Sequence, residues 1–308
     1  VHALRGVLSE RREDCHYGYA VANVDPRGVG NSEGDVYLWG SQDAQDGYDF
    51  IEWVTAQEWC NGRATMIGNS GVCMAHWRIA ATRPPHLACL AAWEGQGDLY
   101  RESYFCGGIP NPDYETHIIQ ALAVNNYIED TPAMVAKYPL MNAYYRDKIV
   151  DWNKIRIPTY VTAGWVHHHL RGAFEGFRRI RTPKKWMRAH RDFEWPDTYT
   201  PANMEDVRKF FDRYCKEIHN GWEMTPRVRI DVMDAGDIVE IGTADEIYYD
   251  PRHPYTWALL SSMPQMGIKG EDLFNIQGTP PNLFTEIHGD AFAPRNPQAL
   301  KIDFVKEP

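Results

Sequence analysis

Long apolar runs, an excess of positive charge and paired cysteines are all missing from this 308-residue sequence. No stretch approaches the roughly 18 apolar residues of a membrane-spanning helix, so we expect no membrane insertion. The net charge of −10 disfavours nucleic acid as a partner. Nucleic acids and anionic membrane surfaces both repel an acidic protein.

Two kinds of motif are also missing. The six cysteines are scattered and form no C-x-x-C pair, which argues against a zinc site and is typical of reduced thiols in a cytoplasmic protein; they are Cys15, Cys60, Cys73, Cys89, Cys106 and Cys215. No G-x-x-x-x-G-K-[ST] motif occurs, so no phosphate-binding loop is available for an ATPase. We therefore expect neither a cofactor nor ATPase activity.

What is present is a large apolar fraction, 44%, arranged in alternating patterns. Short apolar runs alternate with segments of helical periodicity over the first two thirds of the chain, which predicts an α/β fold with a mostly parallel sheet flanked by helices. The predicted strands are 19–24, 63–68, 87–93, 157–163 and 184–190, and the predicted helices are 43–55, 72–81, 172–180 and 203–218. Residues 98–152 are predicted to be a helical insertion, and the residues after Pro226 a small α+β tail.

The stretch "MIGNSGVCMAHW", Met66–Trp77, places Ser70 between a predicted strand and a predicted helix. A serine at such a turn, flanked by glycines, is typical of a nucleophile elbow, where the backbone approaches itself closely and the hydroxyl is exposed. The alternative is a serine that caps the helix through its side chain. The motif alone does not separate the two.

The wider text resembles a known enzyme family. "GYAVANVDPRGVGNSEGD", "RPPHLACLAAWEGQGDLYRE" and "KKWMRAHRDFEWPD" occur in the order found in the cocaine-esterase and X-prolyl dipeptidyl aminopeptidase-like α/β hydrolases. The resemblance covers about residues 18–230. It implies a serine esterase, amidase or peptidase with Ser70 as nucleophile and the Gly71 backbone amide as an oxyanion donor. The family's usual final glycine of the elbow is Cys73 here.

The rest of the triad departs from the family's pattern. Family members usually carry Asp two residues after the Trp of "GWVHHHLRG", where this sequence has His167. Three interpretations stay open. His190 is the base without a strong acid partner; or the roles are swapped, with His167, His168 or His169 as base and Asp192 or Glu194 as acid, since triads are defined by geometry; or the site is inactive.

The cluster His167-His168-His169 also raises the question of a metal. Adjacent histidines on a strand point to opposite faces, so at most His167 and His169 would share an ion. No carboxylate lies at helpful local spacing. We therefore interpret the cluster as a polar loop and expect no metal. The glycine-rich loop "DPRGVGNSEG" matches no phosphate-binding pattern, and we interpret Asp25 and Arg27 as structural.

From about Val232 the sequence resembles a different family. "VMDAGDIVEIGTADEIYYDPRHPYTWALLSSMP" and the text to Pro308 are similar to the C-terminal extension of oligopeptide and dipeptide ABC-transporter ATP-binding subunits. We therefore divide the chain into a truncated hydrolase domain, 1–230, and a tail, 231–308, without the nucleotide-binding core. The resemblance implies contact with transporter subunits, or self-association through an apolar surface of the tail.

Two classes of function follow. The first is a serine hydrolase acting on a small ester, amide or peptide, including X-prolyl peptides, and impaired by truncation and by the triad substitutions. The second is a non-catalytic chimeric scaffold that carries a transporter subunit's peripheral domain. In either case the sequence predicts a chimera, joined naturally or artificially near "RVRIDVMDAGDIVEIG".

Overall fold

The computed structural model describes residues 17–121, 126–234, 237–261, 292–296, 299 and 301. Much of the predicted tail, including the proline-rich "IQGTPPN", therefore lies outside the described residues. Within the described part, no helix has the length and apolar character needed to cross a lipid bilayer.

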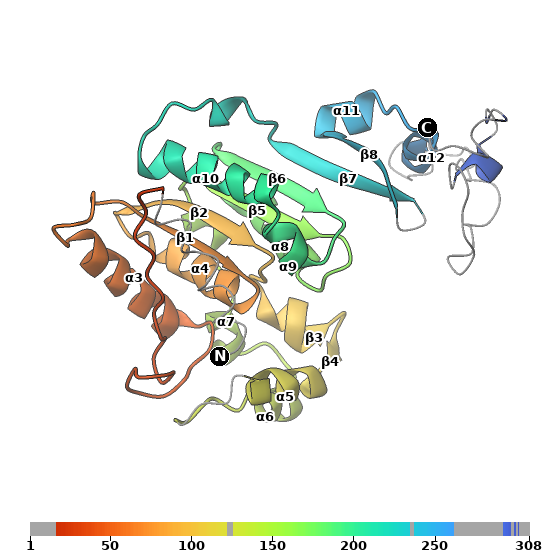
Figure 1. The fold of residues 1–308 in the computed structure, drawn as a ribbon. Helices are drawn as coiled ribbons and strands as arrows, with labels where there is room; N and C mark the ends of the chain where they lie inside the picture. Colours follow the sequence, from red (N-terminus) through yellow and green to blue (C-terminus); the bar gives the residue numbers. More distant parts are fainter. Residues whose placement is uncertain are drawn as a thin grey trace.

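Six strands form one sheet in the order β1-β2-β5-β6-β7-β8 (Figure 1). The strands are β1 (Ala64–Asn69), β2 (Leu87–Trp93), β5 (Thr159–Gly164), β6 (Lys185–His190), β7 (Val228–Asp234) and β8 (Asp237–Thr243). All neighbours are parallel except β7 and β8. The carboxyl ends of β1, β2, β5 and β6 consequently meet at one edge, where ligands of open α/β sheets bind.

Helices cover both faces of this sheet. One face packs against α3 (Ser41–Thr55), α4 (Gly71–Thr82) and α8 (Leu170–Arg179), and the other against α10 (Pro201–Cys215). Strand β2 reads LACLAAW and sends alternate residues into the two clusters, so it is apolar throughout. The mostly parallel α/β fold predicted from the sequence is confirmed.

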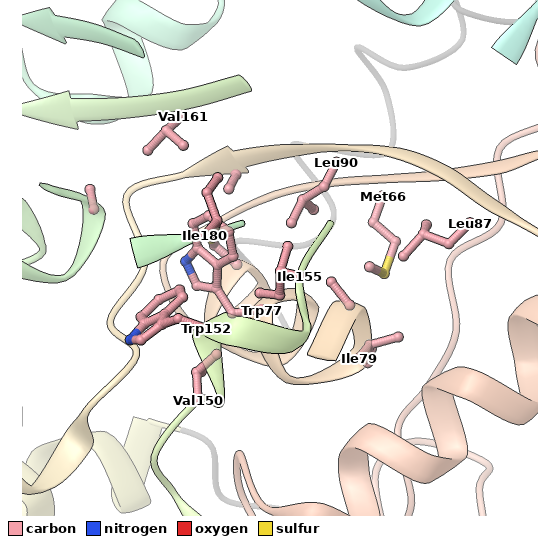
Figure 2. Packing of buried hydrophobic residues seen from close by; sticks show 14 of the residues in the cluster. Met66, Trp77, Ile79, Leu87, Leu90, Val150, Trp152, Ile155, Val161 and Ile180 are labelled. Atoms are coloured by element: carbon pink, nitrogen blue, oxygen red, sulfur yellow. The ribbon is translucent and has the colours of Figure 1, made fainter. Parts of the chain in front are cut away.

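Figure 2 shows the core on the α4 face, where Trp77 of α4 meets Trp152. Their ring centroids are 5.1 Å apart in an edge-to-face arrangement, the geometry that aromatic pairs prefer. Gly176 of α8 leaves room for both rings, because an added Cβ would lie 3.1 Å from each. This packing fixes α8 against α4 and so positions the first turn of α8 near Ser70.

The described part of the insertion, residues 98–121 and 126–152, is mostly helical. Its elements are η1 (Tyr100–Tyr104), β3 (Phe105–Cys106), β4 (Ile109–Pro110), α5 (Pro112–Ala121), α6 (Thr131–Lys137) and α7 (Ala143–Asp147), followed by η2 (Trp152–Lys154). Tyr145 is fully buried among aromatic neighbours and donates its hydroxyl to the carbonyls of Met134 and Tyr138, both at 2.9 Å. Figure 1 shows α5 and α6 packed together away from the sheet.

The predicted strand at 19–24 is wrong. Residues 19–24 belong to no strand, and most of them are exposed. Residues 20–24 line an open groove of about 610 Å³ against Phe50, Trp53 and Trp59. An apolar run becomes a strand only where a neighbour completes its hydrogen-bond ladder, and among the described residues none pairs with this one.

The two parts of the chain share the sheet. The expected boundary at residue 230 falls inside β7, and β8 extends the same sheet as its antiparallel edge strand. Thr243 then starts α11 (Ala244–Tyr249) with a capping box, in which Thr243 and Glu246 each bond the other's backbone amide. The described tail continues with α12 (Pro254–Ser261) and η4 (Ala293–Arg295).

Candidate active site

Ser70 lies at the turn between β1 and α4, at the carboxyl edge of the sheet. Its backbone has φ 58° and ψ −125°, a conformation that costs free energy for any residue with a side chain. Its side chain makes no capping hydrogen bond to α4. Helix capping therefore does not account for Ser70, whereas a nucleophile elbow requires this backbone.

Close contacts around the turn explain the small residues in the motif. A Cβ on Gly68 would lie 2.4 Å from Cγ1 of Val72, so the elbow has no room for one. A Cβ on Gly95 would lie 2.5 Å from Sγ of Cys73. Gly95 thus accommodates the cysteine that stands where the family's elbow usually has glycine.

His169 reaches Ser70 from the N-terminus of α8. Its Nε2 lies 3.4 Å from Ser70 Oγ, and the ring is buried. Its other nitrogen, Nδ1, lies 3.7 Å from Oε2 of Glu194, the first residue of α9 (Glu194–Thr198). The structure thus brings a hydroxyl, an imidazole and a carboxylate into one line, in the order of a catalytic triad.

Glu194 is held as a carboxylate. Burial opposes its ionisation, but His169 nearby and the hydrogen bond from Asn69 outweigh burial, and the pKa of Glu194 falls below its ordinary value. Asn69 Nδ2 donates to Glu194 Oε2 at 3.0 Å, directly beside Ser70 in the sequence. An ionised acid next to His169 favours the ring tautomer with its proton on Nδ1.

His167 lies beside Glu194. Among the described residues, His167 makes no hydrogen bond to Ser70. Its Nε2 is 3.4 Å from Glu194 Oε2 and its Nδ1 is 3.5 Å from Oε2 of Glu94. Burial and the neighbouring His169 lower the pKa of His167. His168 is exposed, and its Nε2 lies 3.0 Å from the Tyr114 hydroxyl. Partial burial and the two adjacent histidines lower the pKa of His168 to about 4.

His190, the leading candidate for the base in the sequence, faces a different partner. It ends β6 in register with Gly164 and is fully buried. Its Nε2 lies 2.6 Å from Oε1 of Glu94, and its Nδ1 lies 3.1 Å from the Asp192 carbonyl. The structure records no hydrogen bond between His190 and Ser70 in the described residues.

Of the two candidate acids, only Glu194 lies at the histidines. The Asp192 carboxylate is 59% exposed and its recorded ion pair is with Arg191, at 3.4 Å. Asp197, which the sequence did not single out, binds Arg188 through both carboxylate oxygens and lies 3.6 Å from His190 Nδ1. This pairing orients His190 rather than His169.

Sequence reasoning missed Glu94 and Asn69. Glu94 directly follows β2 and has φ 52°, and its buried carboxylate lies between His167 and His190. Asn69, the last residue of β1, is paired with Trp93, the last residue of β2, and Glu94 follows Trp93. Asn69 and Glu94 therefore lie at the same edge of the sheet. The rule that ligands gather at the carboxyl ends of parallel strands would have found them.

The glycine-rich loop has structural contacts, in agreement with its interpretation from sequence. Arg27 pairs with Asp46 of α3, with 2.6 Å between Arg27 NH2 and Asp46 Oδ1. Asp25 Oδ2 accepts a bond of 3.3 Å from the Asn31 amide.

Two family models match separate parts of the chain. Residues 9–132 match the family model described as X-Pro dipeptidyl-peptidase (S15 family). Residues 239–302 match the model for the oligopeptide/dipeptide transporter, C-terminal region. The second match begins within β8, so the transporter-like segment supplies the edge strand of the sheet.

A solved structure supports the first part. The CocE/NonD family hydrolase from Staphylococcus aureus is 34% identical, with a TM-score of 0.68, over 71% of this chain and 40% of that chain. The chain therefore spans about two fifths of that hydrolase.

Curated relatives match the tail. The oligopeptide transport ATP-binding protein AmiE of Streptococcus pneumoniae is 58% identical over 79 residues, which are 26% of this chain and 22% of AmiE. OppD of Bacillus subtilis is 51% identical over 108 residues, 34% of this chain and 30% of OppD. The chain spans less than a third of these relatives. Both resemblances predicted from the sequence are confirmed: a hydrolase-like α/β segment is joined to a segment similar to the C-terminal region of peptide-transporter ATP-binding proteins.

Proposed function

We propose that the chain is a serine hydrolase of acyl esters or amides, with Ser70 as nucleophile, His169 as base and Glu194 as the acid that orients it. The observation that carries the proposal is the 3.4 Å separation between Ser70 Oγ and His169 Nε2, at a strained elbow. Such distances shorten when substrate binds, so 3.4 Å is compatible with proton transfer. This assignment is the swapped interpretation of the triad.

The proposed reaction uses these groups in turn. Ser70 Oγ attacks the acyl carbonyl carbon while its proton moves to His169 Nε2. The Gly71 amide, in the first turn of α4, has no partner within the helix and donates to the oxyanion. His169 then protonates the departing alcohol or amine, and water hydrolyses the acyl-enzyme by the reverse sequence of proton transfers.

Glu194 is preferred to Asp192 as the acid because it touches His169 and is ionised. Its carboxylate stabilises the imidazolium that forms when His169 accepts a proton. His190 and Glu94 form a separate buried pair beneath this line. We assign them to positioning of the sheet edge rather than to proton transfer with Ser70.

The substrate class follows from the resemblance and from access to the site. Ser70 is half-buried, and Val72, Val166 and Phe193 expose apolar surface on the adjoining turns. Phe193 packs 5.8 Å from the His167 ring. We infer a small ester, amide or peptide with an apolar acyl group, X-prolyl peptides being included through the matched family model.

The test is intact-mass spectrometry of the full chain after incubation with a fluorophosphonate probe, which labels activated serines. We expect a single adduct that is absent from Ser70→Ala. A folded wild-type chain that takes up no probe would overturn the proposal.

A second candidate is the non-catalytic chimeric scaffold. The observation that favours it is the pairing of β8 with β7, because β8 contains the start of the transporter-like segment and is hydrogen-bonded to the sheet of the hydrolase-like segment. In this case the tail would bring the hydrolase-like sheet to transporter subunits, or to a second copy of the chain. The same probe experiment separates the candidates, and a single intact transcript in the source would support natural fusion, whereas two transcripts would contradict it.

We also infer a cytoplasmic location. The described cysteines form no disulfide, and Cys89 and Cys215 remain thiols although their sulfurs are 3.7 Å apart. Reduced neighbouring thiols are typical of a reducing compartment. Cell fractionation with an antibody against the chain tests this, and recovery in an extracellular fraction would contradict it.

A further inference from the structure

Four metal-binding side chains converge beside Ser70: Glu94, His167, His169 and Glu194. One ligand atom from each lies within 4.8 Å of all the others. They come from the end of β2, the turn after β5, the start of α8 and the start of α9. Glu94, His169 and Glu194 are buried, and the His167 side chain is only 10% exposed.

Two of their separations fit a tetrahedral ion. Zinc binds nitrogen and oxygen ligands at about 2.0–2.2 Å, which places tetrahedral ligand atoms roughly 3.4 Å apart. Oε2 of Glu194 lies 3.4 Å from Nε2 of His167 and 3.7 Å from Nδ1 of His169. Oε2 of Glu94 lies 3.5 Å from Nδ1, the other ring nitrogen of His167, so Glu94 joins the same ion by a side-chain adjustment within the 4.8 Å that separates the four ligand atoms.

Unsatisfied polar atoms point to a ligand independently of this spacing. Both carboxylate oxygens of Glu94 and the Nδ1 atom of His169 are buried without an aligned hydrogen bond from any described residue. Nε2 of His190 lies 2.6 Å from Oε1 of Glu94, but the two groups are not aligned for a hydrogen bond. Burying a carboxylate without hydrogen bonds is costly, and a cation bound to it removes that cost.

We propose that Glu94, His167, His169 and Glu194 form a binding site for a first-row divalent cation, with Zn²⁺ as the best-fitting ion. Two carboxylates neutralise a charge of +2, and two imidazole nitrogens select Zn²⁺ over Mg²⁺ and Ca²⁺, which prefer oxygen ligands. The sequence-based expectation of no metal missed the site because neither carboxylate lies near the histidines in the sequence.

Metal binding at this site inhibits the hydrolase. This consequence rests on the proposed function, whereas the site itself does not. An ion on Nδ1 of His169 leaves the ring proton on Nε2, so the nitrogen facing Ser70 donates a hydrogen bond and no longer accepts the serine proton. Glu194 is diverted from His169 to the metal at the same time. Zinc thus switches off the base without touching Ser70.

The three adjacent histidines are a weaker alternative. His168 is exposed, its Nε2 lies at the Tyr114 hydroxyl, and a site of three neutral imidazoles leaves the charge of the ion uncompensated. The alternative uses His168, whereas the proposed site uses Glu94 and Glu194. Glu94→Gln therefore tests the proposed site, and His168→Gln is the matched control.

The experiment is a zinc titration of the full chain against a chromophoric chelator, followed by fluorophosphonate labelling with and without Zn²⁺. We expect one zinc per wild-type chain, binding weakened at least roughly tenfold in Glu94→Gln and unchanged in His168→Gln. Melting temperatures check that each variant folds. If Glu94→Gln does not fold, Glu194→Gln takes its place in the titration, because Glu194 also belongs to the proposed site alone.

The outcomes separate the two claims. Absence of zinc binding, or equal binding in wild type and Glu94→Gln, overturns the site. Zinc binding that requires Glu94 while labelling of Ser70 stays unchanged overturns the inhibition alone. Absence of labelling even in metal-free protein overturns the proposed function and the inhibition with it, while the titration still decides the site.

Discussion

The hydroxyl of Ser70 lies 3.4 Å from Nε2 of His169, although 99 residues separate the two in the sequence. The parallel order of β1, β2 and β5 brings the ends of these strands together, and the turn after β5 folds back so that α8 begins beside the elbow. This relationship decides which histidine is assigned to the chemistry.

Replacing His169 tests that assignment. We expect His169→Gln to lower the rate of fluorophosphonate labelling at Ser70 by roughly 10²–10⁴-fold, the contribution typical of a general base. The measurement is the time course of adduct formation by intact mass. His168→Gln, which changes an exposed neighbour, is expected to label at the wild-type rate.

The same labelling experiment on His190→Gln gives the outcome that would contradict the assignment of His169 as base. If His190→Gln folds and loses labelling while His169→Gln retains it, His190 is the base and the swapped triad is wrong. Because His190 is fully buried against Glu94, both variants need a melting temperature beside the labelling rate.

Backbone strain at the elbow predicts that glycine is more stable at position 70 than a residue with a side chain. Ser70 has φ 58°, which glycine adopts without a steric penalty. We expect Ser70→Gly to unfold at higher urea concentration than Ser70→Ala, by about 1 kcal/mol in the free energy of unfolding. Equal stability of the two variants would show that the turn is relaxed.

The contact between Gly95 and Cys73 predicts a coupled pair of mutations. A Cβ on Gly95 would meet Sγ at 2.5 Å and Cβ at 2.8 Å, so Gly95→Ala is expected to destabilise the fold by about 1–3 kcal/mol through overpacking. Cys73→Ala removes the sulfur and is expected to recover part of this loss in the double variant. Additive free energies of unfolding in the double-mutant cycle would contradict the clash.

Glu115 of α5 predicts a dependence of stability on pH. Burial raises the pKa of Glu115 to about 7, against the smaller opposing effects of the Ser103 hydroxyl and Lys148. The folded state thus holds a proton that the unfolded state releases at lower pH. The protonated carboxyl contributes stability that is present below about pH 4.5 and lost as the pH rises to about 7.

The expected loss is about 3 kcal/mol in the free energy of unfolding across that range. Glu115→Gln stays uncharged at every pH and is expected to remove this loss of stability between pH 4.5 and 7, which urea titrations at several pH values would measure. Parallel pH profiles for wild type and Glu115→Gln would show that the carboxyl is not responsible.

Several elements could be predicted from local sequence. The apolar run 87–93 became β2 with the same ends, and the helix expected at 43–55 is α3, which starts two residues earlier at Ser41. Residues 19–24 failed although their pattern is similar. A strand requires a partner across the ladder, and the partner is not encoded in the strand's own residues.

The site shows the same division. The motif Gly68–Gly71 was enough to predict a turn at Ser70 between a strand and a helix, because such a turn depends on neighbours in the chain. The backbone conformation of Ser70 and the missing capping bond then separated the elbow from the helix cap. Glu94 was missed because nothing beside it in the sequence marks a buried carboxylate. It became visible once β2 was placed next to β1.

The sequence by itself determined the alternation of strands and helices, the turn at Ser70 and the change of family near residue 232. The first depends on local hydrophobic periodicity, the second on the conformation of a few neighbouring residues, and the third on sequence motifs that are contiguous in the chain. Only the tertiary structure decided that His169, and not His190, faces Ser70, and that Glu94 and Glu194 surround the histidines. Side chains that meet across different strands are placed by strand order and register, which are long-range properties of the packed core.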